Sequence, residues 1–121
     1  MLIKMLEPDF IHKDDRGQLT QLVREGFSQF NVIFSKKGVL RGDHYHKENR
    51  EAFYVITGGF TLKAEKDGVT ESYDFKPGDM FLVEPYVIHS FYYTEDTYLA
   101  SMYDIGVEKP DGTKDIFTRD E

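Results

Sequence analysis

Short stretches of β-branched and aromatic residues, separated by glycine-containing turns, fill most of this chain. The clearest turns are Gly58-Gly59, Lys66-Asp67-Gly68 and Lys76-Pro77-Gly78-Asp79, and such sequences are typical of hairpins and tight turns. No window keeps an apolar 3.6-residue period beyond a few residues, so any helix is expected to be short and peripheral. The pattern therefore favours an all-β fold, either a sandwich or a small barrel.

The expected strands follow from this punctuation. Within 69–75, Val69, Glu71, Tyr73 and Phe75 fall on one face and the residues between them on the other, as in a half-buried strand. The last stretch, 108–121, is polar and is expected to be an arm or a frayed end. The full set of expected strands is 18–23, 29–35, 53–57, 60–65, 69–75, 80–84, 89–93 and 97–103.

Length and composition narrow the class of protein. With 121 residues, 40% hydrophobic and 15% aromatic, the chain is expected to form one globular domain over 1–121. The longest apolar runs, such as 80–83, are too short to span a membrane, and residues 1–7 do not resemble a secretory signal. There is no cysteine, which excludes disulfides and thiol chemistry. We expect a cytoplasmic protein.

The charge argues against a nucleic-acid partner. The formal net charge is −7, whereas nucleic-acid binding depends on Lys and Arg that neutralise phosphates. The distribution is uneven, with a net +2 over 1–50 and −9 over 51–121. The basic residues of the first part form either a solvated surface or a local anion site; they are Arg16, Arg24, Lys36, Lys37, Arg41 and Lys47.

The positions of the histidines carry most of the functional information. His44 and His46 are two residues apart, so on a strand their side chains share a face. Glu51 follows five residues after His46, and His89 lies on a later segment. Imidazole and carboxylate groups in such a set suit one divalent metal ion, and the ligand types alone leave Zn, Fe, Mn, Ni or Cu open. His12 stands outside this pattern and is interpreted as a surface residue.

The spacing of these residues resembles that of the cupins. Gly38, His44, His46, Glu51 and Gly58 fit G-x5-H-x-H-x4-E-x6-G at every position, and Gly78 and His89 keep the spacing of a second motif. The match covers roughly 38–93. It implies a double-stranded β-helix, the jelly-roll barrel, with His44, His46, Glu51 and His89 as metal ligands.

The second motif departs from the cupin pattern at three positions. Glu84 replaces its usual proline, Tyr86 its glycine and Tyr93 its asparagine. These positions shape a turn and do not bind metal, so the metal prediction stands.

A narrower resemblance concerns the sugar-nucleotide cupins. The segments Asp15-Arg16-Gly17 and Arg41-Gly42-Asp43-His44-Tyr45-His46 look like those of the 3,5-epimerases and 3,4-ketoisomerases of dTDP-4-keto-6-deoxyhexoses. The second segment, with Glu51 and Tyr86-Val87-Ile88-His89, also resembles the C-terminal cupin domains of capsular-polysaccharide epimerase/reductases. Those domains bind a metal and act on a UDP-4-keto sugar.

This resemblance implies two roles for the same histidines. In the ketoisomerases the residues matching His44 and His46 are an acid/base pair, but an imidazole bound to a metal is not free to carry protons. If both bind metal, the base is another group, with Tyr54, Tyr86, Tyr92 or Asp43 as candidates. Arg16 and Arg41, with Lys47, are expected to bind a diphosphate, since Arg suits bidentate phosphate contacts.

Three functions remain open at this stage. The first is an epimerase or isomerase of a nucleotide-linked 4-keto hexose in cell-surface polysaccharide biosynthesis. The second is a metal-dependent oxygenase, and the third is a non-catalytic module that binds a small molecule. By resemblance to single-domain cupins we expect a homodimer formed through 18–35 and the chain after Tyr103.

Overall fold

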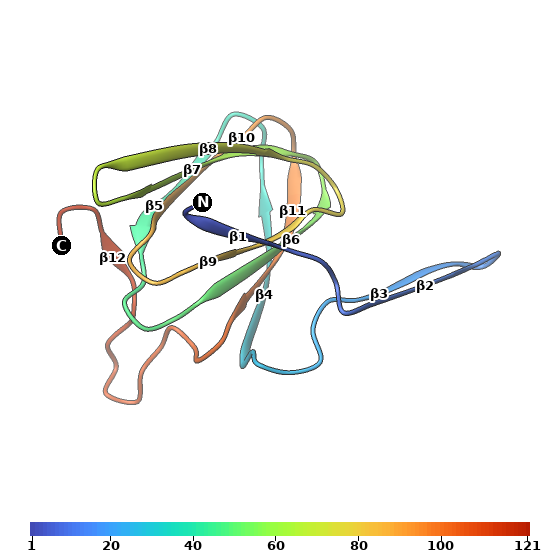
Figure 1. Ribbon diagram of the computed structural model, residues 1–121, viewed down its shortest axis with the longest axis horizontal. Helices are drawn as coiled ribbons and strands as arrows, with labels where there is room; N and C mark the ends of the chain where they lie inside the picture. The colour runs from blue at the N-terminus through green and yellow to red at the C-terminus, as the bar shows by residue number, and fades with distance from the viewer.

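Aromatic and aliphatic side chains at alternate positions of the strands form a core between two antiparallel sheets. The computed structural model describes residues 1–121 as twelve strands without a helix (Figure 1). Because successive side chains of a strand point to opposite faces, one face of each strand can be apolar while the other meets solvent. The absence of a sustained helical period agrees with this outcome. No helix in the structure is long and apolar enough to cross a membrane.

Each of the two large sheets has five strands. The first has the order β1-β9-β6-β11-β4 and the second the order β12-β5-β10-β7-β8. Neighbours in these orders are often far apart in sequence, as expected for a jelly roll. The first sheet consists of β1 (Ile3–Leu6), β9 (Met80–Val83), β6 (Glu51–Thr57), β11 (Thr97–Tyr103) and β4 (Gln29–Ser35); the second consists of β12 (Phe117–Thr118), β5 (Leu40–Tyr45), β10 (Ile88–Tyr93), β7 (Phe60–Lys66) and β8 (Val69–Phe75).

The core is rich in aromatic rings. Phe75 and Phe81 stack with their centroids 4.3 Å apart, and Phe60 packs against Phe91 at 5.3 Å. Burial of such rings is the main stabilising contribution in a domain of this size. At its edge this core meets His89, whose ring centre lies 6.4 Å from that of Phe53 and 6.2 Å from that of Phe91.

A separate hairpin projects from the first sheet. It consists of β2 (Phe10–Asp14) and β3 (Gly17–Gln21), which pair only with each other, and Figure 1 shows it extending away from the two large sheets. Arg16 lies in its turn and pairs with Asp14 at 2.6 Å. The apolar side chains of Phe10, Ile11 and Leu19 are exposed on this hairpin.

Most expected strands are confirmed, and one prediction is wrong. The strands expected at 29–35, 69–75 and 97–103 have the observed bounds. The segment 108–121 is not a frayed end. Its strand β12 pairs with β5 through Phe117 and Tyr45, and Asp115 is only 1% exposed. The polar composition misled because one polar residue, Asp115, is buried with hydrogen-bonding partners, although most of the segment is exposed.

Candidate metal centre

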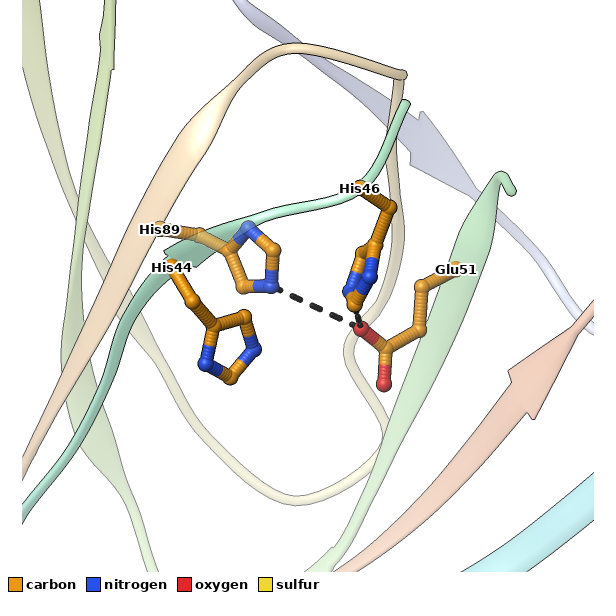
Figure 2. A group of neighbouring side chains, drawn as sticks. All are labelled: His44, His46, Glu51 and His89. Carbon is orange, nitrogen blue, oxygen red and sulfur yellow. Dashed lines mark hydrogen bonds and ion pairs between the residues drawn. The ribbon is translucent and has the colours of Figure 1, made fainter. Parts of the chain in front are cut away.

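Three strands bring the four predicted metal ligands together. His44 lies near the end of β5 and His46 just after it, while Glu51 begins β6 and His89 lies on β10. His44 and His89 are directly paired across the sheet. Each of the four offers a ligand atom, and these atoms all lie within 4.8 Å of one another (Figure 2).

Two of the histidines are held in a defined tautomer. Nδ1 of His46 lies 2.7 Å from the carbonyl oxygen of Asp115, and Nδ1 of His89 lies 2.9 Å from that of Val87. A carbonyl oxygen can only accept a hydrogen bond, so both Nδ1 atoms must carry the proton. In its neutral form each ring therefore faces Glu51 with an unprotonated Nε2 that can bind a cation, and in its protonated form with an Nε2–H that can donate to the carboxylate. His44 makes no hydrogen bond through its ring and is half-buried.

Glu51 lies at the centre of this group. Its Oε1 atom is 3.1 Å from Nε2 of His46 and 3.5 Å from Nε2 of His89, as Figure 2 shows. Its other oxygen accepts a hydrogen bond of 2.5 Å from Ser101. Burial alone would raise the pKa of Glu51, but the contacts with His46 and His89 outweigh it and lower that pKa to about 2. The carboxylate is therefore charged at neutral pH.

The histidine pKa values diverge because their surroundings differ. Burial, reinforced by the neighbouring rings of His89 and His46, lowers the pKa of His44 to about 4. Burial would also lower the pKa of His46, but its contact with the Glu51 carboxylate overcomes this and raises it. At neutral pH the structure thus contains a neutral His44 ring and a carboxylate faced by two imidazoles.

The four residues fit a divalent cation. The Nε2 atom of His89 is buried and has no hydrogen-bonding partner, which is costly unless something else satisfies it. Tetrahedral zinc sites with bonds near 2.0–2.1 Å place their donor atoms about 3.3 Å apart. The two separations from Glu51 Oε1, 3.1 and 3.5 Å, lie near that spacing, and all four ligand atoms lie within 4.8 Å of one another. The His/Glu group can therefore hold a metal ion.

A glycine allows the strands to approach closely here. Gly42 has a φ of +93°, and a Cβ atom on it would lie 2.6 Å from the carbonyl oxygen of His89. Any other residue would push β5 away from β10 and separate His44 from His89. The close approach of β5 and β10 thus explains why position 42 is a glycine.

The site opens into a cavity of about 220 Å³. Its walls are mostly apolar, and Arg41 provides the only permanent positive charge among them. Arg41 donates from Nε to Ser35 Oγ at 2.7 Å, which holds the guanidinium in place. The lining residues are Ile33, Arg41, Gly42, His44, Glu51, Phe53, His89, Phe91, Tyr93, Leu99 and Tyr103.

The structure brings only one of the three expected substrate-binding cations to this cavity. Arg41 lines it, whereas Arg16 lies at the tip of the distant hairpin (Figure 1). Lys47 is exposed in the loop after β5, with its Nζ 4.1 Å from the centre of the Phe117 ring, and does not line the cavity. In one copy of the chain, Arg16 and Lys47 therefore lie outside the site.

The candidate tyrosines also lie elsewhere. Tyr54 packs in a second apolar cluster with Met80 and Met102, on the face of β6 opposite Glu51. Tyr86 is exposed and stacks on Tyr45 at 6.0 Å, and its N–H donates to the carbonyl of His46. With its φ of +67°, Tyr86 adopts the conformation expected of the glycine that it replaces.

The other two candidate bases, and the fourth histidine, also lie away from the cavity. Tyr92 is exposed, and Asp43 is exposed and paired with Arg119 at 2.6 Å. His12 is exposed, as expected, and lies 3.2 Å from Asp14 on the hairpin.

Sequence reasoning missed three residues of the site. Ser101 bonds Glu51, Tyr103 lies against His46 with ring centres 5.2 Å apart, and Asp115 bonds His46 through its carbonyl. Burial raises the pKa of Tyr103, and the negative charge of Glu51 adds to this effect. The parity of β11 could have identified Ser101 and Tyr103, because alternate residues of a strand share a face.

Comparisons of sequence agree with the motif. Residues 12–98 match the family described as "Polysaccharide biosynthesis C-terminal domain". The chain is 39% identical over 49 residues to a UDP-2-acetamido-2,6-beta-L-arabino-hexul-4-ose reductase of Pseudomonas aeruginosa, covering 40% of this chain and 13% of that protein. It is 36% identical over 50 residues to a 3-hydroxyanthranilate 3,4-dioxygenase of Xanthomonas oryzae, covering 41% and 28%. The matched segments thus span less than a third of these relatives.

Comparisons of structure agree with the fold. The neighbours include dTDP-4-dehydrorhamnose 3,5-epimerases and sugar 3,4-ketoisomerases. A 3,4-ketoisomerase from Helicobacter canadensis has a TM-score of 0.79 at 17% identity, covering 93% of this chain and 89% of that one. These neighbours confirm the predicted jelly roll. The chain belongs to the polysaccharide biosynthesis C-terminal domain family and has the cupin fold of the sugar-nucleotide epimerases and ketoisomerases.

Proposed function

We propose that this chain is a metal-binding cupin that epimerises or isomerises a nucleotide-linked 4-keto hexose in cell-surface polysaccharide biosynthesis. The family match and the Pseudomonas reductase support the pathway class, and the structural neighbours support the reaction class. The observation that carries the proposal is one cavity lined by three members of the His/Glu group (His44, Glu51 and His89) and by the anchored Arg41.

The cavity suits removal of a proton next to a ketone. That step needs a placed base and stabilisation of the negative charge that develops on the ketone oxygen. A divalent cation held by His46, Glu51 and His89 supplies such stabilisation when bound and leaves the His44 ring free to carry a proton. The apolar walls exclude water, which strengthens electrostatic interactions inside.

His44 is the strongest candidate for moving the proton. Its ring is half-buried, lines the cavity and forms no hydrogen bond to the protein. Its pKa of about 4 keeps it neutral, so it can accept a proton at neutral pH. Tyr93 and Tyr103 also line the cavity, but burial raises both pKa values, so these hydroxyls serve as hydrogen-bond donors.

Arg41 is the residue we assign to the diphosphate. A second copy of the chain would have to supply any contact from Arg16, because Arg16 does not line the cavity of its own copy and its hairpin extends away from the two large sheets (Figure 1). The expected homodimer has support from the exposed apolar side chains of Phe30, Val32 and Phe34 on β4, an edge strand of the first sheet. Edge strands with apolar faces favour association with another chain.

Two further assignments complete the proposal. We propose that residues 1–121 act together as one cupin domain, because the C-terminal residues pair with β5 next to the ligands. The cytoplasmic location and the identity of the metal stay predictions.

Solvent exchange tests the proposed reaction. The protein is incubated in D2O with dTDP-4-keto-6-deoxyglucose and, separately, with a UDP-linked 4-keto hexose, and the sugar is analysed by NMR. We expect deuterium at a carbon next to the ketone, and much slower exchange for Arg41→Ala. Arg50→Ala is the control, since Arg50 is exposed and pairs with Glu84 and not with the cavity. Absence of exchange with both sugars would refute the epimerase or isomerase assignment.

Sequence similarity favours one second candidate, a metal-dependent dioxygenase. The support is the Xanthomonas relative, whose match is among the strongest in identity. Two or more histidines with a carboxylate also suit iron in oxygenases. Iron-loaded protein would then consume oxygen with an aromatic substrate such as 3-hydroxyanthranilate, and no oxygen uptake would exclude this candidate.

A further inference from the structure

One buried carboxylate lies outside the group of metal ligands. Asp115 is 1% exposed, although it belongs to a polar segment near the end of the chain. It also lies beyond residues 12–98, the part that matches the family. A buried carboxylate is costly unless hydrogen bonds satisfy it, so its partners indicate why it is there.

Every polar group of Asp115 has a hydrogen-bonding partner, and most of these partners belong to His46 or to the three residues that follow it. Its N–H donates to the carbonyl of Val107 at 2.8 Å, and its own carbonyl accepts from Nδ1 of His46 at 2.7 Å. The carboxylate accepts from the backbone N–H groups of Lys47, Glu48 and Asn49 at 2.8 to 3.0 Å, and from Nδ2 of Asn49 at 2.8 Å. One residue thus binds both the imidazole of His46 and the backbone that follows it.

The following residues fasten this arrangement to the barrel. We call 115–121 the C-terminal clasp. Its strand β12 pairs with β5, with Thr118 opposite His44. The hydroxyl of Tyr45 donates to the carbonyl of Glu121 at 2.7 Å. Arg119 bonds Asp43 at 2.6 Å and Glu65 at 2.5 Å. The clasp therefore contacts β5 on both sides of His44 and holds the loop after His46.

These contacts bear directly on the chemistry of His46. A backbone carbonyl at Nδ1 fixes the proton there, orients the ring and leaves Nε2 as the atom that faces Glu51. In many metal sites, the ring nitrogen of a ligating histidine that does not bind the metal likewise donates a hydrogen bond to a carboxylate or carbonyl. Here the carbonyl comes from 69 residues further along the chain.

We propose that the C-terminal clasp is part of the metal site, with Asp115 as the positioning residue that sets the tautomer and orientation of His46. This inference rests on the proposed metal binding. It assigns a role to a segment outside the matched family region. Asp115 does not line the cavity and acts through the His46 ring and the backbone of 47–49.

Zinc binding by full-length variants tests the role of Asp115. Affinity is measured by competition with a chromophoric chelator for the wild type, Asp115→Ala and Asp115→Asn, with Asp111→Asn as the control. Asp111 is exposed and bonds only Thr113 in the same segment. We expect Asp115→Ala to lose about 10- to 100-fold in affinity, as for other partners of ligating histidines. Asp115→Asn, which keeps one oxygen acceptor, should lie between, and Asp111→Asn should match the wild type.

Nitrogen NMR of the metal-free protein provides a readout that a purely structural role would not move. In the wild type at a pH where the ring is neutral, His46 should carry its proton on Nδ1. Asp115→Ala keeps the backbone carbonyl but removes the carboxylate that fixes it to residues 47–49, so the carbonyl should shift and the two tautomers should mix. A wild-type His46 protonated on Nε2 would overturn the proposal even if no variant folds. Equal zinc affinity and equal tautomers in wild type and folded Asp115 variants would also overturn it.

The same experiments separate this inference from the proposed function. Wild-type protein that binds no zinc, iron, manganese or nickel would refute the metal centre, and the role of the clasp with it. Wild-type protein that binds one equivalent, with both the affinity and the His46 tautomer unchanged in Asp115→Ala, would refute the role of the clasp alone.

Discussion

Metal binding should raise the thermal stability of this protein by an amount that can be worked out. At a free metal concentration one hundred times the Kd, binding to the native state adds about 2.7 kcal/mol. A chain of 121 residues has an unfolding entropy of about 0.25 kcal/mol/K, from about 2.1 cal/mol/K per residue. The expected rise in Tm is therefore about 11 °C. Differential scanning calorimetry of chelated and reloaded protein measures it.

His89 provides the variant that tests this reasoning. Its Nε2 atom is buried without a partner, so its removal takes away a ligand. If His89→Ala weakens binding at least 100-fold, the same metal concentration adds only about 0.4 kcal/mol, or about 2 °C. His12→Ala is the control, because His12 is an exposed histidine on the hairpin. An equal metal-induced shift in His89→Ala and wild type, or no shift in the wild type, would refute the assignment of the ligands.

Three further predictions concern pH and the core. Because the pKa of His46 is raised, its protonated form stabilises the metal-free protein at low pH, and this contribution is lost as pH rises through that pKa. The proton also competes with the metal, so the metal-induced Tm shift should grow from about pH 6 to about pH 8. A shift that shrinks over this range would contradict the prediction. Phe60→Ala should cost about 3–5 kcal/mol in urea unfolding, because the ring is buried among other aromatic rings; a loss below about 1 kcal/mol would contradict the packing. Gly58→Ala should lower the free energy of unfolding by on the order of 3 kcal/mol, since its Cβ would overlap the backbone of Asp96. Gly68 has a similar φ but open space around it, so Gly68→Ala should lower it by only about 1 kcal/mol. Equal losses would mean that the strain in φ alone decides the effect.

The strands could be predicted where their pairing is local or their pattern is regular. The strand expected at 69–75 alternates clearly and forms a hairpin with its neighbour, so its bounds were predictable. By contrast β1 has four residues and pairs with β9, about 77 positions away. The two residues of β12 contain no period at all. Short strands that depend on distant partners leave too little pattern in the sequence.

The proximity of the four His/Glu residues could be predicted because their spacing already encodes the geometry. His44 and His46 share a face through the two-residue period, and the motif supplies Glu51 and His89. The same period shows why Tyr54 was a poor candidate. It lies three residues after Glu51, an odd number, so on a regular strand it points to the opposite face. The alternation of side chains along β6 therefore shows, without a structure, that Tyr54 and Glu51 lie on opposite faces of the strand.

Asp115 could not be predicted in this way. An aspartate in a polar segment has the composition of a solvated tail, and only tertiary structure places it beside residues 46–49. Its burial depends on five hydrogen bonds to one loop and one ring, which no local pattern encodes. Buried polar groups that hold functional residues are generally the least visible part of a site in sequence.

The two roles predicted for the histidines can be divided among them by their hydrogen bonds. His46 and His89 are each anchored through Nδ1 to a backbone carbonyl, so turning either ring would break a buried hydrogen bond and cost about 1–3 kcal/mol. His44 has no such anchor and lines the cavity. Within the proposed function, the anchored pair and Glu51 suit permanent metal binding. Of the three rings, His44 alone can turn towards a substrate without breaking a bond to the protein, so proton transfer is assigned to His44.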